Sequence, residues 1–153
     1  MPNAKNRRRE EKRVKVMVSA CLMGENCKYS GGNNRNEKVL NFVSKCEVIK
    51  VCPEVLGGLP TPRLPCEIRE GLVVNREGGS CTGEYVRGAK LALELAKEEQ
   101  PDLVILQPRS PSCGAKQIYD GTFTKTLISG SGIFANMMKE NGFTVVEPDD
   151  LTL

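Results

Sequence analysis

The segment Val14–Ala20 (VKVMVSA), followed directly by Cys21, gives the clearest indication of the fold class. It is a short apolar run rich in β-branched residues, which is typical of a strand buried on both faces. Three more runs have the same character: Glu47–Val51 (EVIKV), Leu103–Gln107 (LVILQ) and Phe143–Glu147 (FTVVE). Both faces of a parallel sheet are normally covered, so runs of this kind predict parallel strands.

Helical patterns separate the four runs. Asn36–Lys45 carries apolar residues at helical spacing, and Thr82–Gln100 has a broad apolar face that ends before Pro101. Ser131–Glu140 follows, with Asn141-Gly142 as its C-cap. The alternation predicts a single-domain α/β fold, an open and mostly parallel sheet with helices on both faces.

Three segments break the alternation. Glu67–Asn75 (EIREGLVVN) predicts a small hairpin excursion outside the sheet. Lys116–Thr126 reads as irregular, with Asp120-Gly121 as a turn signal. Val51–Arg63 (VCPEVLGGLPTPR) holds three Pro and two Gly in thirteen residues, so we expect a rigid loop without regular structure.

Length and charge predict the domain organisation. The 153 residues indicate one domain, at residues 14–153, behind a disordered basic tail at residues 1–13. The tail holds six Lys or Arg and two Glu, a charge of +4, whereas the remaining 16 Lys or Arg and 17 Asp or Glu leave the body at −1. A near-neutral body argues against a nucleic-acid partner, although the tail alone could be an arm that contacts RNA.

The sequence also predicts where the protein acts. No apolar run approaches the roughly 18 residues of a membrane helix, and the polar N-terminus lacks the apolar core of a secretion signal. The seven Cys are therefore expected to be reduced thiols or metal ligands in the cytoplasm, with no membrane partner. The absence of His excludes Ser-His-Asp catalysis, Cys-His catalysis and every metal site with a His ligand.

Three cysteines follow predicted strands. Cys21 comes after the first, Cys52 after the second and Cys113 in the loop after the third, whereas Cys46 precedes a strand. Ligands bind beyond the carboxyl ends of parallel strands, so the first three thiols are expected to meet at that edge, opposite Cys46. Such thiols suit an iron–sulfur cluster with one iron free of protein ligands, or they are small buried hydrophobes.

Other polar side chains lie close to these cysteines in sequence. Without His, proton transfer falls to carboxylates, Lys or Tyr, and Glu54 is the natural base because it lies two residues from Cys52. Glu67 is the next candidate. Arg63 could bind a substrate carbonyl or phosphate, or brace its loop through a salt bridge. Ser110 and Ser112 flank the third cysteine of the set in the segment RSPSCG.

Four motifs together resemble a known family: SACLMG at residues 19–24, YSGG at 29–32, VCPEVLGGLPTPR at 51–63 and SPSCG at 110–114. They are similar to the domain of unknown function 523 family, whose characterised members are thiouracil desulfidases. The resemblance implies a [4Fe-4S] cluster on Cys21, Cys52 and Cys113. It also implies acidic and hydroxyl helpers at Glu54 and at Ser110 or Ser112.

The expected function follows from this resemblance. It is the iron–sulfur-dependent, non-redox desulfuration of a thiolated pyrimidine, a small-molecule partner of the thiouracil or thiouridine type, with release of sulfide. Tyr29, Arg63 and Glu67 are the expected substrate-binding residues. The chain departs from the family at Ser30, where the family has Asp, and Cys27 is an alternative ligand. A non-catalytic iron–sulfur or zinc-binding module is the alternative function.

Overall fold

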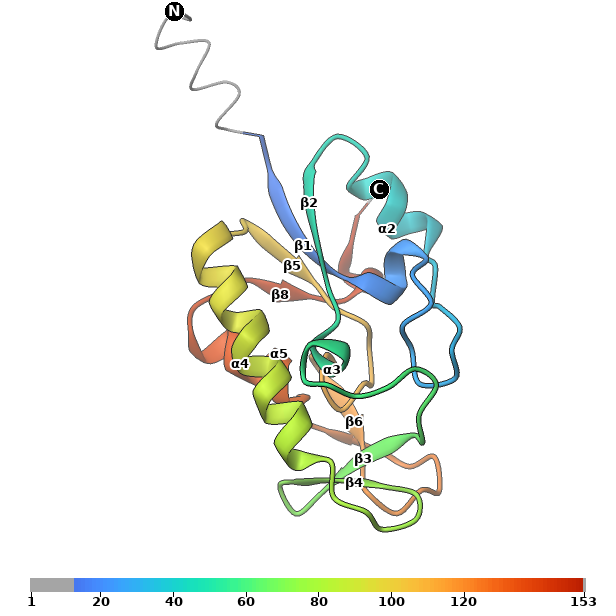
Figure 1. Ribbon diagram of the computed structural model, residues 1–153. Helices are drawn as coiled ribbons and strands as arrows, with labels where there is room; N and C mark the ends of the chain where they lie inside the picture. The colour runs from blue at the N-terminus through green and yellow to red at the C-terminus, as the bar shows by residue number, and fades with distance from the viewer. Residues whose placement is uncertain (1–12, 153) are drawn as a thin grey trace, which may run out of the picture.

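A computed structural model describes residues 13–152. Its main sheet has four parallel strands in the order β2-β1-β5-β8 (Figure 1). The strands are β1 (Lys15–Ser19), β2 (Glu47–Val51), β5 (Leu103–Ile105) and β8 (Val145–Val146). All four apolar runs thus form the predicted parallel sheet.

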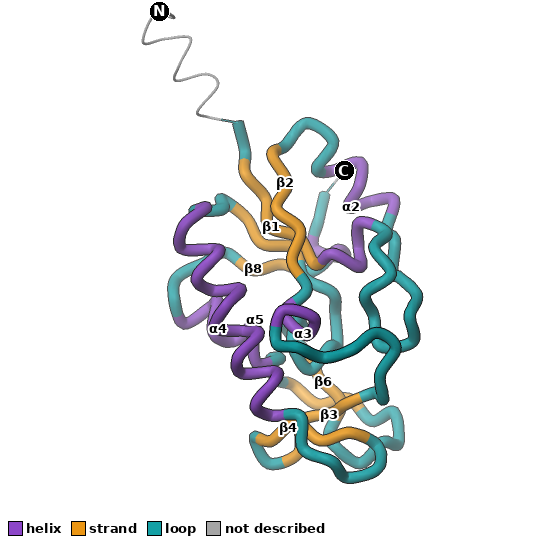
Figure 2. The backbone as a smooth tube through the Cα atoms, viewed as in Figure 1, coloured by secondary structure: helices purple, strands orange, loops and turns teal. Residues whose placement is uncertain are grey.

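Helices cover both faces of this sheet, as predicted (Figure 2). One face packs against α4 (Thr82–Glu99) and α5 (Ile133–Glu140). The other packs against the 3₁₀ turn η1 (Ala20–Met23), α2 (Glu37–Phe42) and Leu151, which follows the 3₁₀ turn η2 (Pro148–Asp150). Alternation along β1 explains both layers, because Met17 faces the first and its neighbours Val16 and Val18 the second.

Two strands end earlier than their apolar runs. The backbone N–H of Gln107 donates to Ser19 Oγ at 2.9 Å, so the segment after β5 leaves the ladder there. After β8, Glu147 begins a capping box in which its backbone N–H donates to Asp150 Oδ2 at 2.9 Å. Side-chain partners therefore replace strand partners at both ends.

Two hairpins lie outside the main sheet. The predicted one is formed by β3 (Cys66–Arg69) and β4 (Leu72–Asn75), which pair antiparallel. The expectation that Lys116–Thr126 is irregular was wrong, because β6 (Gln117–Tyr119) pairs antiparallel with β7 (Leu127–Ser129). Each of these strands has only three residues, too short for a two-residue alternation to stand out in the sequence.

The Pro-rich segment 51–63 also contains regular structure that was not predicted. Pro53–Leu56 forms the single helical turn α3, with Cys52 as its N-cap and Gly57 as its C-cap. Pro is favourable at the first helical position, because its fixed φ suits the helix and the N–H it lacks has no partner there. This turn places Glu54 on a helix rather than on a loop.

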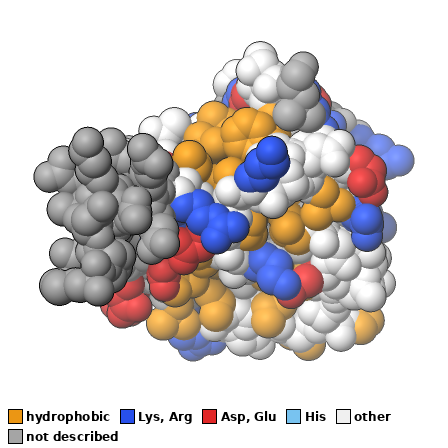
Figure 3. Space-filling model, turned by 90° about the horizontal axis from the view of Figure 1, so that it is seen from above, with side chains coloured by type: hydrophobic (Ala, Val, Ile, Leu, Met, Phe, Trp, Pro, Cys, Tyr) orange, Lys and Arg blue, Asp and Glu red, His pale blue; other side chains and the backbone are white. Residues whose placement is uncertain are grey.

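The N-terminal tail and the charged surface were also predicted from the sequence. The predicted tail lies outside the described residues apart from Arg13, which is exposed. No helix of the described part is long and apolar enough to cross a membrane. On the face seen from above, Lys and Arg side chains lie among Asp and Glu (Figure 3), as the near-neutral body predicts.

Candidate active site

The carboxyl ends of three neighbouring strands surround one cavity of about 410 Å³. Cys21 lies on η1 directly after β1, Cys52 directly follows β2, and Cys113 lies in the loop after β5. All three line the cavity. The chain crosses from one side of β1 to the other between β2 and β5, and such a switch in strand order is where open α/β sheets bind ligands.

Cys27 is a fourth thiol at this cavity, and it forms hydrogen bonds with both Cys21 and Cys52. These bonds lower the pKa of Cys21 and lower the pKa of Cys52 to about 7, while they raise the pKa of Cys27. Asn34 adds a donor 3.5 Å from Cys21 Sγ. Burial raises the pKa of Cys113. Two of the thiols are thus prepared for the thiolate form that binds metal.

The donor set fits an iron–sulfur cluster. Three thiols from three separate segments face one space, and cysteine thiolates are the usual protein ligands of such clusters. Within residues 13–152, no three His, Cys, Asp or Glu side chains come close enough to hold a single metal ion. The thiols instead surround a cavity, which is the arrangement that a cluster of several iron and sulfur atoms requires. Cys46 lies away from it, against the core on the α2 side.

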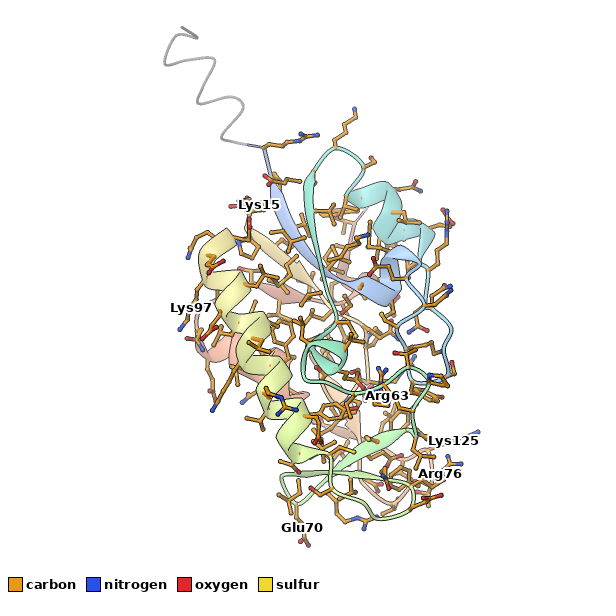
Figure 4. The ribbon with its side chains drawn as sticks, in the orientation of Figure 1. Lys15, Arg63, Glu70, Arg76, Lys97 and Lys125 are labelled. Atoms are coloured by element: carbon orange, nitrogen blue, oxygen red, sulfur yellow. The ribbon has the colours of Figure 1, made fainter. Side chains whose placement is uncertain are left out.

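Glu54 and Arg63 form an ion pair in the cavity wall, with side chains only 16% and 5% exposed. Both Nε and a terminal nitrogen of Arg63 lie 3.3 Å from Glu54 Oε1. The other donors of the guanidinium reach the Pro60 carbonyl, the Thr61 hydroxyl and the Cys27 carbonyl at 2.9–3.0 Å. Arg63 therefore braces its own loop and the Cys27 segment, and its contacts favour this role over substrate binding (Figure 4).

The two candidate serines occupy different positions. Ser110 lines the cavity, and its Oγ accepts the backbone N–H groups of Ser112 and Cys113 at 3.0 Å. Its lone pairs are engaged, so its hydroxyl proton is what it can offer a ligand. Ser112 is fully buried, is not part of the cavity lining, and its Oγ has no partner among the described residues. The structure therefore brings only Ser110 to the site.

Glu67 and Tyr29 both line the cavity but differ in exposure. Glu67 is buried, and its Oε1 accepts the backbone N–H groups of Gly121 and Phe123 at 3.0 and 3.1 Å. It thus fastens the β6–β7 turn to the β3–β4 hairpin. Tyr29 is 46% exposed, and its ring lies at the mouth, 5.7 Å from Lys28 Nζ.

A family model described as 2-thiouracil desulfurase matches residues 16–150, nearly all of the described chain. The chain belongs to the 2-thiouracil desulfurase family. The resemblance seen in the four motifs is thereby confirmed.

The chain is also similar to two other proteins over most of their lengths. The uncharacterized protein YbbK of Bacillus subtilis (strain 168) is 38% identical over 146 residues, which cover 89% of this chain and 97% of that protein. A solved structure of the [4Fe-4S]-dependent thiouracil desulfidase TudS is 36% identical, with a TM-score of 0.83, covering 91% of this chain and 93% of that one. The second match also confirms the predicted fold.

The cavity of this desulfurase family member carries more positive than negative side chains. Lys28, Arg76, Arg109 and Lys125 line it, and none of them forms an ion pair within residues 13–152. Figure 4 shows Arg76 and Lys125 at the end of the molecule that carries the hairpins. The two acidic residues of the lining are already bonded. This lining favours an electron-rich or anionic ligand.

Sequence reasoning missed several residues of the site. Tyr85 of α4 donates its hydroxyl to Glu54 Oε1 at 2.5 Å, and Ser19 at the end of β1 lines the cavity. Phe123 and Lys125 line the cavity with left-handed backbones, at φ of 59° and 62°. Non-glycine residues of that conformation cluster at functional sites. Tyr85 did have one signal, since it lies four residues before Ala89 on the buried face of its helix.

Proposed function

We propose that the chain hydrolyses the thiocarbonyl group of a thiolated pyrimidine in a [4Fe-4S]-dependent reaction. Water replaces sulfur, so that one C–O bond forms, the C–S bond breaks and both protons of the water leave with the sulfur as hydrogen sulfide. No electron is gained or lost overall. The family and the TudS match support desulfuration.

One observation carries the proposal. Three cysteines that are 31 and 61 residues apart in sequence line one cavity together with Glu54. A cluster held by Cys21, Cys52 and Cys113 would supply an iron without a protein ligand, a Lewis acid for the thiocarbonyl sulfur. The positions of the predicted strand ends indicate the same three thiols.

The proton transfers fall to Glu54 in this proposal. Its Oε1 is bonded to Tyr85 and Arg63, whereas Oε2 accepts no hydrogen bond from the described residues. Oε2 is also not one of the buried atoms of residues 13–152 that lack a hydrogen-bond partner, so it is accessible from the cavity. An accessible carboxylate oxygen can take a proton from the attacking water and return it to the departing sulfur.

The other residues bind and orient. Ser110 offers its hydroxyl proton to an oxygen or nitrogen of the ring. The cationic side chains of the lining stabilise the negative charge that develops on the substrate when water adds to it. Tyr29 offers its ring to the substrate at the mouth of the cavity.

The seven free thiols suit a reducing compartment, so we place the reaction in the cytoplasm.

The test measures sulfide and uracil from 2-thiouracil with protein prepared and reconstituted under anaerobic conditions. We expect equal amounts of the two products, with no added oxidant or reductant, and label from H₂¹⁸O in the new carbonyl group. Absence of the label, or a need for a reductant, would contradict the hydrolytic proposal.

The alternative function, a non-catalytic iron–sulfur or zinc-binding module, makes a different prediction. Such a protein would hold its metal and release no sulfide from any thiolated base, nucleoside or nucleotide. The accessible Glu54 oxygen at the thiol-lined cavity favours the enzyme, because a purely structural metal site is normally closed by its ligands.

A further inference from the structure

Tyr85 is a buried polar residue of the cavity wall with no role in the proposed reaction. It lies in the first turns of α4 and is only 2% exposed. Its hydroxyl donates to Glu54 Oε1 at 2.5 Å. Burial and the nearby carboxylate raise the pKa of Tyr85, so the hydroxyl stays protonated and donates.

The bond makes the two oxygens of Glu54 unequal. Tyr85 and Arg63 converge on Oε1 from two different segments, α4 and the Pro-rich loop. Two donors from different directions fix both the position and the rotation of a carboxylate better than one does. Oε2 is thereby held at a defined place while it remains without a protein partner.

Glu54 needs such an anchor. It belongs to the four-residue turn α3, and a helix of that length has little stability of its own. A glutamate side chain also has three rotatable bonds. Tyr85 belongs to an 18-residue helix with a buried face, and its ring has only two rotatable bonds. The rigid partner therefore defines the geometry of the flexible one.

We propose that Tyr85 is a positioning residue, which holds Glu54 through Oε1 so that Oε2 points to the reacting thiocarbonyl group. This inference rests on the proposed function. It assigns Tyr85 no contact with the substrate, so its loss should slow the chemical step and leave substrate binding unchanged.

The test compares wild type, Tyr85→Phe, Glu54→Gln and the double variant, each anaerobically reconstituted and normalised to iron. We expect Tyr85→Phe to lower kcat by roughly 10- to 100-fold, the scale of a small misplacement of a reacting group, with KM and iron content unchanged. In the Glu54→Gln background the same substitution should have less than about a two-fold effect, because the two residues act as one unit.

A second measurement needs no activity. Urea unfolding of the same four proteins, followed by circular dichroism, should show midpoint shifts for the two single variants that do not add in the double variant. Additive shifts overturn the contact. An unchanged kcat in Tyr85→Phe, or an equal loss in both backgrounds, overturns the positioning role.

These failures are distinguishable from failure of the proposed function. If the proposed function is wrong, the wild type itself holds iron and releases no sulfide. An active wild type with an unaffected Tyr85→Phe variant would instead retain the proposed function and reject the inference.

Discussion

Gly88 of α4 lies directly against the carbonyl group of Pro53 on α3, so that a methyl group on Gly88 would overlap the Pro53 oxygen. The contact is reciprocal, because a methyl group on Gly57 would overlap the Glu84 carbonyl oxygen of α4. This pair of glycines lets the two helices approach backbone to backbone. The backbone positions of Cys52 and Glu54 therefore depend on this contact between the backbones of α3 and α4.

We expect Gly88→Ala to destabilise the protein by about 1–3 kcal/mol, the usual cost of overpacking, and to lower activity by moving α3. Gly83→Ala is the matched control, because a methyl group there meets nothing within 4 Å. It should leave stability unchanged or raise it by up to about 1 kcal/mol. Denaturant unfolding measures both, and equal stability of the two variants would contradict the contact.

The three proposed ligands are tested by metal content. Cys21→Ala, Cys52→Ala and Cys113→Ala should each lose bound iron and visible absorbance after anaerobic reconstitution, because a cluster on three ligands cannot spare one. Cys46→Ala is the control and should keep both, since it lies on the α2 side of the core. Full iron in one of the three variants would reject that ligand and point to Cys27.

Glu54→Gln should keep the cluster, because an amide of the same size leaves α3 intact. It should lower desulfidation by roughly 10²–10⁴-fold, the usual contribution of a positioned acid or base. Ser110→Ala should show a smaller loss, and Ser112→Ala should act mainly on stability because its side chain is buried. The turnover rate, normalised to iron content, measures these losses. A Glu54→Gln variant with the wild-type rate would leave Glu54 with a structural role only.

The cluster-free protein should show an unusually acidic thiol. Because hydrogen bonding from Cys27 lowers the pKa of Cys52 from 9.0 to about 7, its alkylation should accelerate as pH rises through 7 and then level off. Cys113, whose pKa is raised by burial, should stay slow beyond pH 9. Iodoacetamide labelling with peptide mass spectrometry follows each thiol, and Cys27→Ala should move the Cys52 midpoint toward its ordinary value.

Deletion of residues 1–13 should leave the melting temperature and the rate on free thiouracil nearly unchanged. The segment has almost no apolar side chain to bury and carries a net charge of +4, whereas the rest of the chain is at −1. Thermal unfolding and sulfide release from the shortened protein measure the two effects. A large drop in melting temperature would show that the tail is part of the fold.

The parallel sheet, and the edge of the sheet at which the cysteines gather, can be predicted from the amino-acid sequence alone. Local patterns were sufficient for this, because apolar runs such as Val14–Ala20 and the residues that end them report the local backbone. Parallel strands then bring Cys21, Cys52 and Cys113 to one edge whatever their separation in the chain. The Cys46 position at the other edge followed from the same argument.

Which side chains meet at that edge depends on the packing of the folded chain. The placement of Cys27 between two thiols, the use of Arg63 as a brace and the burial of Ser112 depend on how loops fold over the strand ends. The bond between Tyr85 and Glu54 depends on the approach of two helices that two glycines permit. Such contacts join residues distant in sequence through specific packing, and no local periodicity encodes them.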